Sequence, residues 1–265
     1  MISLVKRHPI ITFFVLSYAL AWMLVPFGSF GAYGPLVAAL IVIPITQGVA
    51  GLKELGLRII RWRVRWYWYA VALGVPLAVH LAVVGLNVAS GAGVPSLTFA
   101  SVTTFLMVFA IRLINPTDGP LGENPGWQGF ALPGLQGSGY SPLIATAIVA
   151  PLVSLWHLPL FFWEPGGLQA SVLVSGLVVT MAATFFYNWL FNRTGGSVLL
   201  VILAHDLEGS IQYELGWIVM GVWLAVTIGL VIFDWKAWRA PAPAEATTPP
   251  PQAMPPRGAA PVTPA

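Results

Sequence analysis

The run YWYAVALGVPLAVHLAVVGLNV, residues 67–88, contains His80 as its one ionisable side chain apart from tyrosines. An α-helix rises about 1.5 Å per residue, so about 20 apolar residues cross the roughly 30 Å hydrocarbon core of a bilayer. A transmembrane β-strand would be shorter and would alternate apolar with polar residues. The run therefore predicts a membrane-spanning helix, in which we interpret the isolated His80 as structural.

Similar apolar runs recur on both sides of this one, at 10–27, 33–49, 97–114, 142–162, 170–190, 197–211 and 217–235. The composition agrees, because 57% of residues are apolar and 8% are charged, whereas about a quarter are charged in soluble domains. We predict an all-α, polytopic protein with eight transmembrane helices in residues 1–239. The motif-bearing core covers about 97–215, and the Pro/Ala-rich residues 240–265 predict a disordered tail.

Basic residues test the predicted topology, because loops rich in Lys and Arg remain on the cytoplasmic side. With the amino terminus inside, every membrane-flanking basic residue falls in an inside loop: Lys6, Arg7, Lys53, Arg58, Arg61, Arg63, Arg65, Arg112, Arg193, Lys236 and Arg239. We therefore expect a multi-pass protein of the cell membrane with both termini in the cytoplasm. The net charge of +3 is small, and we expect no nucleic-acid partner. The absence of cysteine excludes disulfides and a Cys nucleophile.

A carboxylate stands between two apolar runs, in the stretch GENPGWQGFALP at 122–133. A loop carboxylate is usually solvated or caps a helix. Residues 127–135, however, are too apolar for an exposed loop and predict a segment that returns into the bilayer, where such backbone must be buried in protein or line a water-filled cavity. Glu123 is therefore a candidate site residue. Arg112 ends the preceding run and is interpreted as snorkelling to the interface, with Glu123 as the alternative partner.

His157 lies deep in a later apolar run, within LWHLPLFF at 155–162. Pro159 supplies no backbone donor, so the helix is perturbed beside the imidazole. A hydrogen-bonded packing histidine is the alternative to a functional one.

His205 is followed by Asp206, Glu208 and Gly209 inside the apolar run 197–211. On a helix, residues three and four positions apart share a face, which places Glu208 and Gly209 beside His205. Ionisable groups in lipid are costly and usually mark function. These groups, together with the carboxylate of the 122–133 stretch and the earlier histidine, are therefore interpreted as one shared site.

These stretches resemble the CPBP family of intramembrane proteases, also called the CAAX protease and bacteriocin-processing (Abi) family. Its first motif, E-E-x-x-x-R, is often embedded as GEEPGWRGFALPRLQ, and residues 122–136 read GENPGWQGFALPGLQ. Its second motif, F-x-x-x-H, occurs near WHLPLFF, which is present at 156–162 with Val153 in the Phe place. Its third motif, H-x-x-x-N, follows a GSVLL-type start, found here at 196–200 with Gly209 in the Asn place.

The resemblance implies roles for the three central residues. Glu123 would activate a water molecule with the help of His157, and His205 would stabilise the oxyanion together with the third-motif Asn. A carboxylate in a low-dielectric cavity can act as a base near neutral pH. Asn124 replaces the second Glu and Gln128 replaces the Arg, so two opposite charges are lost together.

The third motif also departs from the pattern. Losing one oxyanion donor commonly costs about a hundredfold in rate, and Gly209 offers no side-chain donor. The adjacent Glu208 is a possible replacement, but an ionised carboxylate would repel an oxyanion.

A metal is a separate question. Glu123, His157 and His205 would make a His₂-carboxylate set with an open water position, as in some catalytic zinc sites. The competing mechanism needs no metal, and it is the one we favour for this set.

The leading hypothesis is therefore an endopeptidase that cleaves membrane-anchored peptide or protein substrates with an activated water molecule. The altered motifs motivate a rival hypothesis, a catalytically inactive relative that acts as a membrane binding or scaffold protein. A transporter is the third hypothesis, which lacks support from repeat symmetry.

Overall fold

The computed structural model describes residues 2–91, 93–94, 101–163, 168–211 and 216–240. Every regular element within these ranges is helical, so the predicted all-α class is confirmed. The predicted disordered tail lies outside the described residues except for Ala240, and so do the first residues of the run predicted from 97.

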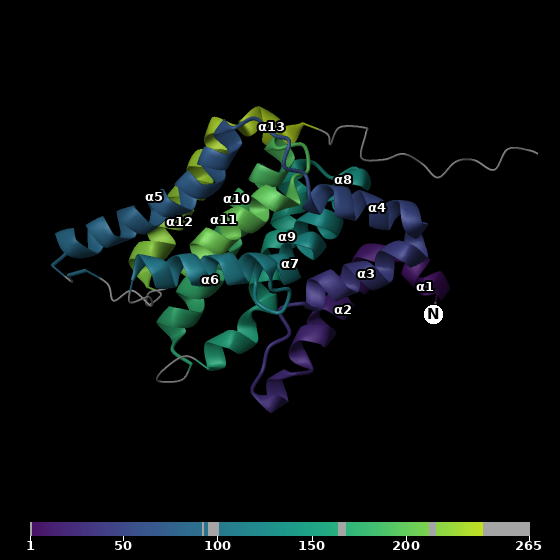
Figure 1. Ribbon diagram of the computed structural model, residues 1–265, viewed down its shortest axis with the longest axis horizontal. Helices are drawn as coiled ribbons and strands as arrows, with labels where there is room; N and C mark the ends of the chain where they lie inside the picture. The colour runs from purple at the N-terminus through teal and green to yellow at the C-terminus, as the bar shows by residue number, and fades with distance from the viewer. Residues whose placement is uncertain (1, 92, 95–100, 164–167, 212–215, 241–265) are drawn as a thin grey trace, which may run out of the picture.

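The first half of the chain forms helices that flank the stretch at 122–133 (Figure 1). They are α1 (Ile2–Arg7), α2 (Pro9–Trp22), η1 (Val25–Phe27), α3 (Gly34–Thr46), α4 (Gly48–Ile59), α5 (Tyr67–Ala89) and α6 (Val102–Ile114). The stretch itself and the second half form α7 (Pro120–Gly126), η2 (Trp127–Ala131), α8 (Leu132–Gly137), α9 (Pro142–Trp156), η3 (Leu158–Phe162), α10 (Ala170–Arg193), α11 (Val198–Ser210), α12 (Trp217–Phe233) and α13 (Trp235–Arg239).

Each predicted span coincides with a helix, but the helices differ in length. Four within the described ranges are long and apolar enough to cross a membrane: Pro9–Phe27, Tyr67–Ala89, Pro142–Phe162 and Ala170–Arg193. Helices α3, α6 and α12 are apolar but shorter, and α11 is shorter still in its apolar part because it carries two carboxylates. The protein is thus a multi-pass membrane protein, while a crossing by all eight helices stays a prediction.

The stretch at 122–133 is helical, and it is buried between other helices. Helix α7 packs closely on α3 and on the segment before it, because a Cβ atom on Gly126 would lie 2.5 Å from the carbonyl oxygen of Pro35 in α3 and one on Gly122 would lie 2.7 Å from that of Ala32. After α7 the chain makes the π-helical turn η2 and continues into α8. The two glycines therefore set how near Glu123 comes to the neighbouring helices.

An aromatic cluster holds this helix against α2 and α9. The ring of Phe13 lies 5.4 Å from that of Trp127 and 5.1 Å from that of Phe130, and Trp127 lies 5.6 Å from Trp156. Edge-on aromatic pairs of this kind add about 0.5–1.5 kcal/mol beyond the area that they bury. The indole of Trp156 also donates to the Ser17 carbonyl at 3.1 Å, which fixes the end of α9.

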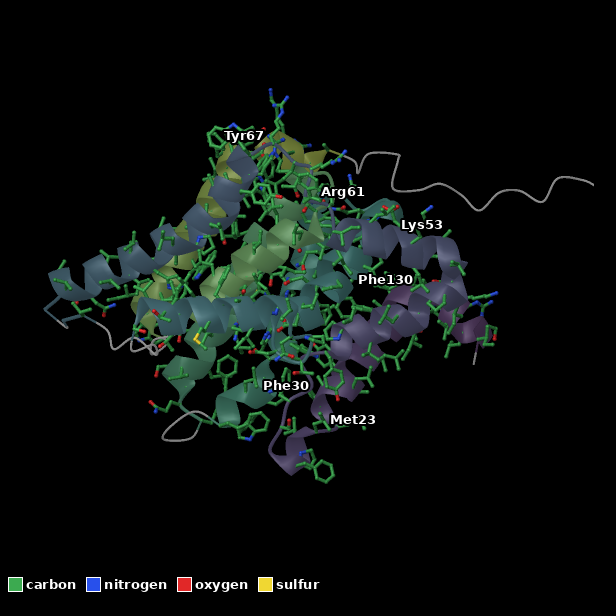
Figure 2. All side chains as sticks on the ribbon, in the orientation of Figure 1. Met23, Phe30, Lys53, Arg61, Tyr67 and Phe130 are labelled. Carbon is green, nitrogen blue, oxygen red and sulfur yellow. The ribbon has the colours of Figure 1, made fainter. Side chains whose placement is uncertain are left out.

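Helices α2 and α3 lie to one side of the molecule and α5 and α12 to the other, with α7, α9, α10 and α11 between them (Figure 1). Figure 2 shows Tyr67 and Arg61 in the upper half of the molecule and Met23 in the lower half. The basic segment between α4 and α5 and the turn that follows α2 thus lie on opposite sides of the molecule in this view, while the predicted topology stays a prediction.

Candidate active site

Glu123 lies in the first turn of α7, which begins at Pro120 after the positive-φ residue Gly119. Only 4% of Glu123 is exposed, and its Oε2 accepts no hydrogen bond from the described residues. Burial raises the pKa of this carboxyl group, while the nearby His157 and Arg112 act in the opposite direction. An unsatisfied buried acceptor costs about 1–3 kcal/mol, so the position favours a small proton donor such as water.

His157 follows the last residue of α9, and its ring is oriented by the backbone. Nδ1 lies 2.9 Å from the carbonyl oxygen of Val153, so Nδ1 carries a proton that it donates to this oxygen. Nε2 then faces Glu123, with 3.6 Å between Nε2 and Oε2. This separation exceeds a direct hydrogen bond and suits two acceptors that share one bridging water.

His205 lies in α11 and is connected to the first motif through the neighbour of Glu123. Its Nδ1 lies 3.1 Å from Oδ1 of Asn124. Its ring stacks on Tyr187 of α10, with centroids 5.1 Å apart and planes inclined by 28°. Sequence reasoning predicted that His205 joins the site, but neither of these contacts.

Asn124 and Gln128 belong to a chain of neutral amides that joins four helical segments. Asn124 Nδ2 donates to Gln128 Oε1 at 3.0 Å, and Gln128 Nε2 donates to Asn188 Oδ1 at 2.9 Å. Asn188 Nδ2 then donates to Thr146 Oγ1 at 3.3 Å. These side chains are buried. At the two positions where the family motif has a Glu and an Arg, this protein thus has Asn124 and Gln128, which hydrogen-bond to each other without charge.

The expectation that Arg112 snorkels to the interface is wrong. Its side chain is 13% exposed, Nε lies 3.1 Å from Oδ1 of Asp206 on α11, and Nη1 lies 3.1 Å from Oδ1 of Asp118. Asp206 is fully buried, and a buried carboxylate requires a partner of this kind. The competing expectation of a direct pair with Glu123 is also replaced by these two aspartates.

The site opens into a cavity of about 1040 Å³. Glu123, His157, His205, Glu208 and Gly209 all line it, although the two histidines are far apart in sequence. Val172, Val179 and Val219 supply part of an apolar wall, which suits a lipid-like or apolar peptide ligand.

The site also includes residues to which the sequence assigned no role. His80 lies in the cavity wall, so the residue interpreted as structural faces the site. Asn188 and Thr146, which do not line the cavity, also had no predicted role and complete the hydrogen-bond chain behind Gln128. Each of these three is a polar residue within an apolar run of the sequence, and that pattern could have identified it as a candidate.

The metal hypothesis can be tested on the donor set. Glu123 and His157 converge on one point, but His205 directs Nδ1 to Asn124. Within the described ranges no group of three His, Cys, Asp or Glu side chains is arranged to hold a metal ion. The residues as placed do not fit a three-ligand zinc site.

Comparison with protein families matches residues 101–207 to the model described as "Type II CAAX prenyl endopeptidase Rce1-like". The matched segment begins at α6 and ends in α11, so it contains Glu123, His157 and His205. A search of curated proteins found no match. The family match agrees with the resemblance drawn from the three motifs.

Proposed function

We propose that this membrane protein hydrolyses peptide bonds in membrane-associated peptides or proteins, because residues 101–207 match the model of the Rce1-like CAAX endopeptidases. The observation that carries the proposal is the pair formed by Glu123 Oε2 and His157 Nε2, two acceptors 3.6 Å apart at the edge of a large cavity.

A water molecule between these two acceptors would donate one proton to each of them. As the water oxygen attacks the peptide carbonyl carbon, the Glu123 carboxylate takes the proton. The carbonyl π electrons move to its oxygen, which becomes the oxyanion of a tetrahedral intermediate. When that intermediate collapses, the C–N bond breaks and Glu123 returns the proton to the departing amine.

The surroundings of Glu123 suit this role. Burial raises the pKa of the Glu123 carboxyl group, which strengthens the carboxylate as a base, and the Val153 carbonyl keeps the proton of His157 on the far nitrogen. The apolar wall would accommodate the lipid-anchored or hydrophobic part of a substrate. In this proposal the protein lies in the cell membrane with both termini in the cytoplasm, and the site around Glu123 lies in the cytoplasmic half of the membrane.

The test uses the full chain in proteoliposomes with a fluorescence-quenched peptide that carries a prenylated cysteine, the substrate class in the family name, and an unprenylated peptide of equal sequence. Glu123→Gln should abolish cleavage while the protein stays folded. Glu54→Gln, on the exposed side of α4, is the matched control and should cleave as the wild type does. Equal cleavage by wild type and Glu123→Gln would refute water activation by Glu123.

The inactive-relative hypothesis predicts a different outcome. The neutral pair of Asn124 and Gln128 is the observation that favours it. If the wild type cleaves neither peptide and Asn124→Glu with Gln128→Arg and Gly209→Asn creates cleavage, the protein is a binding or scaffold protein on the family fold.

A further inference from the structure

Arg112 is a cation held inside the protein at the edge of the candidate site. Two aspartates fix its guanidinium through Nε and Nη1, and it lines the same cavity as Glu123 and His157. A fixed guanidinium in a low-dielectric cavity is a strong donor to negative charge. The proposed hydrolysis assigns it no step.

The third nitrogen of Arg112, Nη2, lies close to Gly119 and to Gly209. A Cβ atom built on Gly119 would lie 3.0 Å from Nη2 and 4.0 Å from Oε1 of Glu123. Both atoms therefore lie near one point beside Gly119, and this is where a bound carbonyl group would meet Nη2. Glu123 thus has Oε2 facing His157 and Oε1 on the Arg112 side.

Gly209 leaves room for the guanidinium of Arg112 beside the site, because it has no side chain. A Cβ atom on Gly209 would lie 2.7 Å from Nη2, a distance that real Cβ contacts essentially never show. Any side chain at 209, including the asparagine of the family motif, would therefore displace the guanidinium of Arg112. The guanidinium of Arg112 therefore occupies the space that a side chain at position 209 would fill.

His205 does not supply the missing donor when its ring is neutral. With the amide orientations of the structure, Asn124 uses Nδ2 to donate to Gln128, so its Oδ1 accepts the proton on His205 Nδ1. The other nitrogen, Nε2, then carries a lone pair and cannot donate to an oxyanion. A donor must come from another residue.

We infer that Arg112 is a catalytic residue. Its guanidinium occupies the space that Gly209 leaves open, and its Nη2 donates to the oxyanion of the tetrahedral intermediate. This rests on the proposed peptide-bond hydrolysis. The arginine reaches the site from α6, outside the three sequence motifs, and its charge substitutes for the side-chain amide that position 209 lacks.

The first experiment separates catalysis from folding. Arg112→Gln with Asp206→Asn removes both charges and keeps a hydrogen-bonding pair, so the Tm should stay near that of the wild type while kcat falls by about 10²–10³, with KM little changed. Arg193→Gln is the matched control, an arginine paired with Asp234 at 3.3 Å outside the cavity lining, and its kcat should be unchanged. A folded double variant with wild-type kcat would overturn the inference.

The second experiment exchanges the donors. Gly209→Asn alone should lose activity because it displaces the guanidinium. Arg112→Ala with Gly209→Asn should recover part of it, because the amide now has room. Free guanidinium ion should also partly restore the single Arg112→Ala variant, an effect that a merely structural arginine would not give. Failure of both rescues in folded protein contradicts the inference.

A third measurement keeps this inference distinct from the proposed function. A phosphinate analogue of the probe peptide carries an anionic tetrahedral centre, and the wild type should bind it at least about 100-fold more tightly than Arg112→Gln with Asp206→Asn does. Binding that depends on Arg112, without turnover by the wild type, would reject the peptidase and retain the anion site. Turnover that requires Glu123 but not Arg112, with equal analogue binding, would retain the peptidase and reject the role of Arg112.

Discussion

The two sides of the candidate site are built with different chemistry. On the side of α9 and α10, Asn124, Gln128 and Asn188 form a chain of neutral hydrogen bonds. On the side of α6 and α11, Arg112 and Asp206 form a buried ion pair. The charges that the first motif has lost at its two altered positions thus occur again on helices that the motif does not include.

This difference shows that the first motif can lose its charged pair while an ion pair and hydrogen bonds still surround Glu123. An ion pair on one helix constrains only that helix, whereas the pair between Arg112 and Asp206 connects α6 to α11. The amide chain in turn connects the first-motif helix to α9 and α10. Glu123 lies between the two networks, and substitutions can test each network separately.

The largest effect is expected on the ionic side. Asp206→Ala leaves the Arg112 charge with only the half-exposed Asp118 as partner and should lower the free energy of unfolding by about 3–5 kcal/mol, measured by denaturation in detergent. Asp118→Ala, whose side chain is 49% exposed, is the control and should cost about 1 kcal/mol or less. Equal losses would show that the pair with Asp206 is no stronger than the exposed one.

The amide side should give a smaller loss. Gln128→Leu keeps the volume but removes the hydrogen bonds that Gln128 makes with Asn124 Nδ2 and Asn188 Oδ1, at an expected cost of about 1–3 kcal/mol. Gln136→Leu, which breaks the part-buried hydrogen bond to Asn192, should cost less because Asn192 is less buried than Asn124 and Asn188. The comparison uses the same unfolding assay, and a larger loss for Gln136→Leu would contradict the cooperative role of the chain.

Glu123 should give a loss that depends on pH. Its pKa in the folded protein is raised above the usual 4.5, so the fold is most stable below that pH and loses stability as the pH rises toward the folded pKa. Glu123→Gln removes this dependence. The stability of the variant relative to the wild type should therefore increase upward from about pH 4.5, by at most about 1.4 kcal/mol per pH unit. A difference that is constant with pH would mean that the carboxyl group keeps its ordinary pKa.

The smallest effect is expected outside both networks. Glu54 pairs with Arg58 one turn later on α4, at 3.1 Å and with half of the glutamate side chain exposed. Glu54→Ala should change the free energy of unfolding by a few tenths of a kcal/mol. A loss near that of Asp206→Ala would mean that burial does not distinguish the ion pairs of this protein.

The helical class and the association of the three motif residues with one cavity could be predicted from the sequence, because the apolar run length and the cost of ionisable groups in lipid are local properties. Helix lengths were less predictable. The run expected from 97 gives a described helix that starts at Val102, where the hydroxyl of Ser101 caps it by accepting from the backbone of Thr104. Gly48, with a positive φ, begins α4 two residues after the end of α3.

The position of Arg112 could not be predicted, because its partners depend on how α6 packs against α11. An arginine near the end of an apolar run has the same sequence signature whether it snorkels or turns inward. The fully buried Asp206 could have suggested a cation partner, but several arginines were candidates. The choice among them is a property of the tertiary structure.

The π-helical turn at Trp127–Ala131 has a consequence for insertions and deletions. A π turn contains about one residue more than an α turn, and such bulges occur mostly as single turns within α-helices. Removing one residue there would leave a regular α-helix, whereas the same deletion in the middle of α10 would rotate every later side chain by about 100°. The helix that carries Glu123 should therefore stay helical after the deletion of one residue from the turn that includes Gln128.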